Sequence, residues 1–235
     1  FIQQAAEVLA LLAPGKAQKD DRPVAGDIAR LVQRYEGRVT DVLRHHLTRA
    51  FVQSGAGAIA RVDPVATFTI DNPSAVAFAR DYVPKLARSI TADRAEALER
   101  TIADAMTEGA SVNQIRVVVM ESPHFSADGI ANRAEMIARS ESARATIDGQ
   151  LSGWEESGVV AGKRWLLAPD GCEFCEAAAA EFADKTIGLR DAFYRKGSTL
   201  AGAAGGTMVL DYSDIAGPPL HPMCRCDLVP VIEGE

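Results

Sequence analysis

The sequence predicts an α+β protein in which a mainly helical N-terminal region is followed by a small α+β module stapled by Cys and His residues. Aromatic residues make up only 6% of the chain, and Ala is abundant, which favours helices packed through small side chains. Apolar residues recur at helical spacing as far as position 157. Beyond Gly158 the pattern changes to short extended segments, and all four cysteines lie in that part.

This change of pattern predicts three segments. Residues 1–71 are expected to form a helical segment that is the end of a longer or fused protein, because the chain starts inside a helix-like pattern. Residues 72–157 continue the helical part. Residues 158–235 form the Cys/His-containing α+β module.

Local signals in the first segment predict two helices and one strand. Residues 1–13 resemble the end of a helix, and the charged stretch 15–23 is interpreted as a linker. A second helix is expected from about 24 to 53, ending in the glycine-bearing stretch 54–58. Residues 66–70 alternate between apolar and polar positions, as a strand does.

The middle segment contains clear helix signals. Asn72 is a good N-cap and Pro73 suits the first helical position, whereas Pro84 is expected to kink this helix. Further helices are expected over about 91–108, 111–121 and 126–157. In the last segment we expect a strand or hairpin near 159–171, a Cys-led turn entering a short helix, a mobile loop over 197–207 and short extended segments at the end.

Composition and charge limit the class of function. Apolar residues make up 47% and charged residues 24% of the 235-residue chain, as in ordinary folded proteins. The net charge of -7 repels phosphate backbones, so general nucleic-acid binding is not expected. No apolar run approaches the roughly 20 residues that a membrane-spanning helix needs, so no membrane is expected as a partner.

The cysteines and one histidine near the C-terminus form a candidate metal site. Cys172 and Cys175 are a knuckle-type pair, and His221, Cys224 and Cys226 follow close together. Structural Zn(II) takes four tetrahedral thiolate and imidazole ligands, and closely spaced pairs supply two each. The predicted cofactor is therefore a structural Zn(II) ion held by four of these five residues, with either Cys224 or Cys226 surplus.

Two other states of the cysteines stay open. Disulfides within or between the two cysteine pairs would form in an oxidising environment, and four free thiols would persist in a reducing one. A catalytic zinc is not indicated, because the sequence has no His-Glu-x-x-His motif and no His-x-Glu pair of the deaminase type. A redox role for Cys172 and Cys175 is not indicated either, since no βαβ pattern surrounds them.

Glu141 falls close to the apolar stripe of the long helix, where an unpaired carboxylate would be costly. Its functional interpretation is a catalytic acid. We favour the structural one, in which an arginine or backbone N–H groups of the C-terminal module satisfy the carboxylate.

Four segments follow one another in a characteristic order. They are Ala138-Arg139-Ser140-Glu141 on the long helix, Gly162-Lys163-Arg164-Trp165 on a strand, the cysteine turn at 172–175, and the ending His221-Pro222-Met223-Cys224-Arg225-Cys226. In this order and spacing they resemble the phage Mu F-like minor head proteins, or head morphogenesis proteins. Serine stands at 140 where that family usually has threonine. The resemblance covers roughly residues 72–232.

The resemblance implies a minor structural protein of a tailed-phage head, not an enzyme. Such a protein acts in procapsid assembly near the portal or the inner capsid surface, and in genome packaging or delivery. Its implied partners are the portal protein, the major capsid or scaffold protein, and further copies of itself in the head. It would be assembled in the host cytoplasm and end in the virion. Arg139, Glu141 and Trp165 then have structural roles.

Two alternatives come from other classes of function. The first is a metal- or thiol-dependent enzyme, such as a hydrolase or a toxin-type domain, on the same scaffold. The second is a zinc-ribbon-like nucleic-acid module, for which the basic residues near the cysteines are modest in number.

Overall fold

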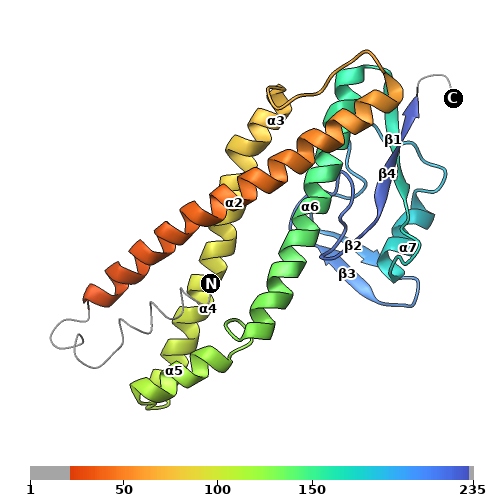
Figure 1. The fold of residues 1–235 in the computed structure, drawn as a ribbon. Coiled ribbons are helices and arrows are strands. Elements are labelled where there is room, and N and C mark those ends of the chain that lie inside the picture. The colour runs from red at the N-terminus through yellow and green to blue at the C-terminus, as the bar shows by residue number, and fades with distance from the viewer. Residues whose placement is uncertain (1–21, 233–235) are drawn as a thin grey trace. The chain divides into compact units, whose positions relative to one another are not determined.

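The computed structural model describes residues 22–232 (Figure 1). The helix expected over 1–13 and most of the linker expected over 15–23 lie outside these residues. The described part has a mainly helical stretch followed by short strands, so the predicted α+β class is confirmed. Its elements are α2 (Arg22–Val62), α3 (Pro73–Ala77), the π-helix η1 (Phe78–Tyr82), α4 (Val83–Thr107), α5 (Val112–Glu121), α6 (Ala127–Ser157), β1 (Val160–Leu166), α7 (Glu173–Glu181), β2 (Ser198–Ala201), β3 (Thr207–Leu210) and β4 (Asp227–Ile232).

The chain divides into two compact units, each described here by itself. Of the described residues, unit 1 comprises 22–45 and 80–135, and unit 2 comprises 46–79 and 136–232. This division differs from the segments 1–71, 72–157 and 158–235 expected from the sequence, which stay a prediction of domain organisation. The candidate metal site lies entirely within unit 2.

Helices α4 and α5 form the centre of unit 1. Gly109, between them, has φ of +76°, as expected for a residue that ends a helix in the left-handed conformation. The expected cap at Ser111 is confirmed, because its backbone N–H donates to the Gln114 side chain at 2.8 Å. A small apolar core holds the helices together; its buried residues are Tyr35, Ala97, Leu98, Ala105, Ile115, Val119 and Phe125.

The start of α4 differs from the prediction at Pro84. The sequence predicts a kink at Pro84 and a new helix from Thr91, but a π-helix lies before α4 and α4 then runs unbroken from Val83. The segments α3, η1 and α4 follow one another without a gap, so Pro84 lies inside a continuous helical run, directly after the π-helix. Proline has no N–H to donate to residue i−4, and the π-helix changes the helical hydrogen-bond pattern at this point. Thr91 is buried in mid-helix, and its hydroxyl donates to Ala87 O at 2.7 Å.

Helix α2 continues through the stretch that was expected to end it. It runs to Val62, and Gly55 lies inside it. A Cβ on Gly55 would lie 2.7 Å from the Phe68 ring and 3.0 Å from Gly149 O, so this glycine allows close packing. Gly55 is therefore a site of close contact and not a helix terminus, whereas a Cβ on Gly57 would meet nothing within 4 Å.

The strand expected over residues 66–70 is wrong. These residues have no strand partner and form a connection between α2 and α3. Phe68 is buried at 5% exposure, with its ring 6.1 Å from that of Phe51. The apolar and polar alternation of residues 66–70 thus arises because the Phe68 side chain is buried, and not because the segment is a strand. The next helix begins as predicted, because the Asn72 side chain accepts from Ser74 N at 2.9 Å and Pro73 follows it.

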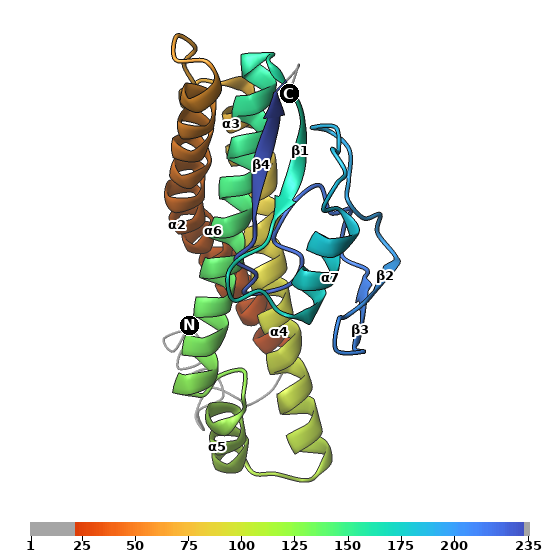
Figure 2. The ribbon, with the colours of Figure 1, turned by 90° about the vertical axis from the view of Figure 1, so that its right-hand side faces the viewer.

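The C-terminal half of α6 and the β1–β4 pair form the frame of unit 2. The long helix ends at Ser157 as predicted, and Gly158 has φ of +68°. Strands β1 and β4 are antiparallel, with Trp165 opposite Leu228 (Figure 2). The main core joins this frame to α7 and the loops, through buried residues that include Ile147, Trp154, Trp165, Phe182, Phe193, Leu220 and Leu228.

The small-residue stretch 197–207 is a β-hairpin and not the mobile loop that the sequence suggested. Strands β2 and β3 pair antiparallel from Ser198–Leu210 to Ala201–Thr207. The Glu173 carboxylate accepts from the backbone N–H of Ala204 at 3.1 Å and of Gly206 at 3.3 Å, which holds the tip against α7.

Among residues 22–232, no helix is both long and apolar enough to cross a bilayer.

Candidate metal centre

Cys172 and Cys175 are placed by the start of α7. Cys172 is the N-cap with extended backbone angles, and its carbonyl accepts the first helical hydrogen bond from Glu176 N at 2.9 Å. A Cys-x-x-Cys spacing across a helix start directs both sulfur atoms to one side. Cys172 is exposed, whereas Cys175 is buried.

His221 and Cys224 are placed by a tight turn after the buried Leu220. Cys224 N donates to His221 O at 3.2 Å, which closes the turn. Met223 inside it has φ of +67°, a left-handed conformation that costs a residue with a Cβ roughly 1–2 kcal/mol. The Met223 N–H points outward from the turn and donates to Ser140 Oγ on α6 at 3.1 Å.

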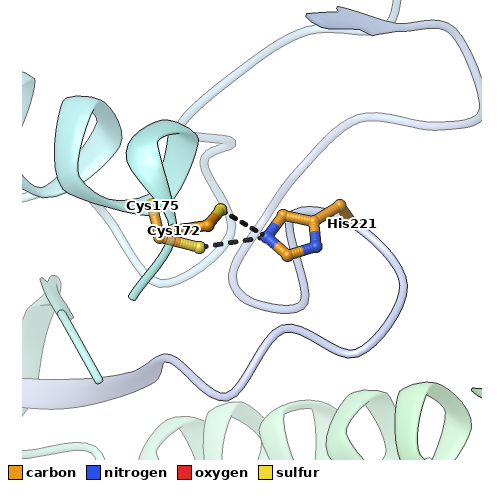
Figure 3. Close-up of side chains that lie close together, drawn as sticks. All are labelled: Cys172, Cys175 and His221. Carbon is orange, nitrogen blue, oxygen red and sulfur yellow. Dashed lines mark hydrogen bonds between the residues drawn. The ribbon is translucent and has the colours of Figure 1, made fainter. Parts of the chain in front are cut away.

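The two ligand segments meet at the His221 imidazole, as Figure 3 shows. Its Nε2 atom lies 3.1 Å from Cys172 Sγ and 3.3 Å from Cys175 Sγ. The other ring nitrogen, Nδ1, lies 2.8 Å from Pro222 O. Because a carbonyl can only accept, Nδ1 carries the proton and Nε2 presents its lone pair to the sulfurs. A backbone carbonyl on the far nitrogen is the usual way to fix the tautomer of a metal-binding histidine.

A second group of donors lies on the other side of Cys175. Cys175, Cys224 and Cys226 are all buried, and their sulfur atoms lie within 4.8 Å of one another. The Cys175 and Cys224 sulfurs are 3.6 Å apart. Cys175 therefore belongs to both groups, since Cys172, Cys175 and His221 also lie within 4.8 Å of one another.

The buried thiols influence one another's protonation. Hydrogen bonds with Cys224 and Cys226, together with burial, raise the pKa of Cys175. Hydrogen bonds from Cys175 and Cys224 lower the pKa of Cys226. The Trp165 indole N–H is buried without an oxygen or nitrogen acceptor among the described residues, and it also lowers the pKa of Cys226.

The donor set fits a thiophilic cation. Neighbouring ligands on a tetrahedral Zn(II) ion lie about 3.5–3.8 Å apart, given metal–ligand bonds of about 2.0–2.3 Å. The separation of 3.6 Å between the Cys175 and Cys224 sulfurs falls in this range, and the separations of 3.1 and 3.3 Å between His221 Nε2 and the two sulfurs are somewhat shorter. The five residues predicted as candidate ligands thus form two groups of three that share Cys175, and each group could hold a metal ion; within the described residues no four of the five have all their ligand atoms within 4.8 Å of one another. No disulfide joins any of the four cysteines in this structure.

The other predicted residues surround this site. The Glu141 side chain is 15% exposed and lies 4.0 Å from Arg144 Nε, so an arginine is its neighbour as expected. Trp165 is buried, and its ring meets that of Phe193 edge-on at 5.2 Å. Arg139 is exposed and lines an open cavity of about 380 Å³ between α6 and residues 223–227.

Neither a family model, nor a curated protein, nor a solved structure matches this chain. The site is therefore interpreted from its own geometry.

Two contacts near the site were not predicted from the sequence. Lys163 on β1 is fully buried, and its ammonium donates to Leu189 O at 2.6 Å, which fixes the loop after α7. Burial lowers the pKa of Lys163 to about 8, and Asp191 and Glu155 oppose this. The second contact is the hydrogen bond from Met223 N to Ser140 Oγ. A lysine or serine at these positions carries no sequence signal that would reveal such a contact.

Proposed function

We propose that the chain is a minor structural protein of a tailed-phage head, and that one structural Zn(II) ion pins its C-terminal module. The ligands would be Cys172, Cys175, His221 and one of Cys224 and Cys226. The protein acts in head assembly near the portal or inner capsid surface. Its partners are the portal and the capsid or scaffold protein.

The single observation behind the zinc assignment is the gathering of all five soft donors around Cys175. The two ligand segments are about 46 residues apart along the chain, and between them lie α7 and the β2–β3 hairpin. A cation at this point would close that loop and join α7 to the turn before β4. Structural zinc of this kind contributes roughly 10 kcal/mol or more in isolated finger peptides.

The head-protein assignment is supported by the way the resembling segments meet. Ser140 of the helix segment accepts a hydrogen bond from Met223 of the ending. Trp165 of the strand segment and Cys226 of the same ending are buried in one apolar core. Segments that are far apart in the sequence thus pack together around residues 221–226. Such packing suits a protein with a structural role. We propose that this role is structural and not enzymatic.

Metal analysis tests the zinc assignment. We expect one zinc per chain in protein purified without chelators, and four reactive thiols after the metal is removed under denaturing conditions. Cys175→Ser should lose the metal, because its sulfur belongs to both donor groups. Of Cys224→Ser and Cys226→Ser, one should keep it. A wild-type chain without zinc, or without reactive thiols after chelation, contradicts the assignment and supports disulfides in the second case.

Particle biochemistry tests the head-protein assignment. The chain should co-purify with portal or capsid protein when the neighbouring structural genes are co-expressed, and it should cross-link to one of them in particles. Deletion of its gene should give defective heads. Normal infectious particles after deletion would refute the proposal. A salt-dependent DNA shift at physiological ionic strength would favour the nucleic-acid module instead.

One observation favours the enzyme alternative. The cavity between α6 and residues 223–227 is lined by Cys224 and Cys226 as well as Arg139 and Arg225. If this were a reactive site, replacement of the surplus cysteine by serine would abolish an activity while zinc content and thermal stability stayed at wild-type levels. If the site is structural, the same variant changes neither.

A further inference from the structure

The turn that carries His221 and Cys224 depends on a conformation that its own sequence disfavours. Met223 is the one non-glycine residue with positive φ among residues 22–232. Glycine adopts the left-handed backbone conformation readily, whereas in any other residue this conformation brings the Cβ into steric repulsion with the backbone. Met223 is also 39% exposed, so little burial of its side chain compensates.

Bonds within the turn leave one backbone donor to be satisfied from outside. Cys224 N donates to His221 O, and Pro222 O is taken by His221 Nδ1. The Met223 N–H is directed instead to Ser140 Oγ at 3.1 Å. This is the contact by which α6 holds the peptide between the two ligand residues.

The hydroxyl comes from a well-anchored support. The C-terminal half of α6 buries Ile147 and Trp154 in the main core of unit 2. The same part of α6 meets the end of α2 through glycines, because a Cβ on Gly153 would lie only 2.4 Å from Gly55 O. Ser140 therefore presents its oxygen from a helix that is packed into the core of unit 2.

We propose that Ser140 is a positioning residue of the metal centre. By accepting from Met223 N, it holds the turn in the left-handed form that points His221 Nε2 and the Cys224 sulfur at Cys175. This inference rests on the proposed zinc site. Partners that orient metal ligands typically contribute 10–100-fold to metal affinity.

The test compares zinc affinity, by competition with a chromogenic chelator, among matched variants. Ser140→Ala should weaken zinc binding about 10-fold or more. Ser140→Thr keeps the hydroxyl and should stay close to wild type. Ser142→Ala on the same helix is the control, since Ser142 is exposed and should have no effect. Circular dichroism of each metal-free variant checks that unit 2 remains folded.

A double variant distinguishes positioning of the turn from general damage. Met223→Gly removes the steric cost of positive φ, so it should restore much of the affinity that Ser140→Ala loses. The Co(II)-substituted proteins should show the same pattern, with the ligand-field spectrum altered in Ser140→Ala and recovered in the double variant. A purely structural loss would not be rescued at Met223.

The outcomes separate this inference from the zinc proposal. Wild-type zinc binding with unchanged affinity in Ser140→Ala overturns the role of Ser140 and leaves the zinc site intact. Loss of affinity that neither Ser140→Thr nor Met223→Gly prevents also overturns it. Absence of zinc from the wild-type chain overturns both.

Discussion

The same substitution, glycine to alanine, is expected to change the free energy of unfolding in opposite directions at two helical positions of unit 2. Gly57 on α2 and Gly153 on α6 are both helical, and glycine costs a helix about 0.5–1 kcal/mol relative to alanine. A Cβ on Gly57 would meet nothing within 4 Å, so Gly57→Ala should stabilise the protein by about that amount. A Cβ on Gly153 would lie 2.4 Å from Gly55 O and 3.1 Å from its Cα.

The contact at Gly153 is with backbone, which cannot turn aside as a side chain can. The helices would have to separate, and overpacking of this kind costs typically about 1–3 kcal/mol. After the gain in helix propensity, Gly153→Ala should still be destabilised by up to about 2 kcal/mol. Gly149→Ala should behave in the same way, because its Cβ would lie 2.2 Å from Phe51 O.

Urea unfolding followed by circular dichroism measures these changes, in buffer with excess zinc so that metal occupancy is constant. The midpoint should rise for Gly57→Ala and fall for Gly153→Ala, with unchanged slopes. Equal stability of the two variants would refute the close approach of α2 and α6 at this point.

Three further substitutions test local energetics by the same assay. Burial raises the pKa of Asp148 to about 6, with Glu141 adding to the shift and Arg144 opposing it, so the folded state binds this proton more tightly than the unfolded chain. Wild type should therefore lose up to about 3 kcal/mol of stability as the pH rises from about 4 through 6, and Asp148→Asn should avoid that loss; identical pH profiles would contradict this. Asn72→Ala removes the cap on Ser74 N and should cost about 1 kcal/mol, whereas no change would mean that the cap is replaced by solvent. Glu141→Ala leaves the half-buried Arg144 without its neighbouring carboxylate and should cost about 1 kcal/mol, and wild-type stability in that variant would exclude a structural role for Glu141.

Local signals predicted the ends of helices well. Asn72, Gly109, Ser111 and Gly158 mark helix termini in the structure as they did in the sequence. Each acts through a few neighbouring backbone groups, so the sequence around it contains the whole cause.

Elements that depend on distant partners could not be predicted in this way. Gly55 looks like a helix end until Phe68 and Gly149 are seen against it. The stretch 197–207 looks mobile until the Glu173 carboxylate is seen to bind its backbone N–H groups. In each case the decisive contact comes from a residue dozens of positions away.

The same division applies to the candidate metal centre. Spacing alone identified all five donors, because Cys-x-x-Cys and His-x-x-Cys pairs are short-range patterns. It could not show that Cys175 belongs to both groups. Nor could it show that Ser140 holds Met223, because one hydrogen bond across 83 positions leaves no trace in composition or periodicity.

The tip of the β2–β3 hairpin, residues 203–205, is exposed and separates two parts of unit 2 along the chain. The part before it carries β1, β2 and the 172–175 thiols, and the part after it carries β3, β4 and the 221–226 donors. Every strand pair and the sulfur cluster join one part to the other. If the chain were cleaved at this tip, we expect the fragment after it to stay bound to the rest of unit 2 when metal is present and to dissociate when metal is removed.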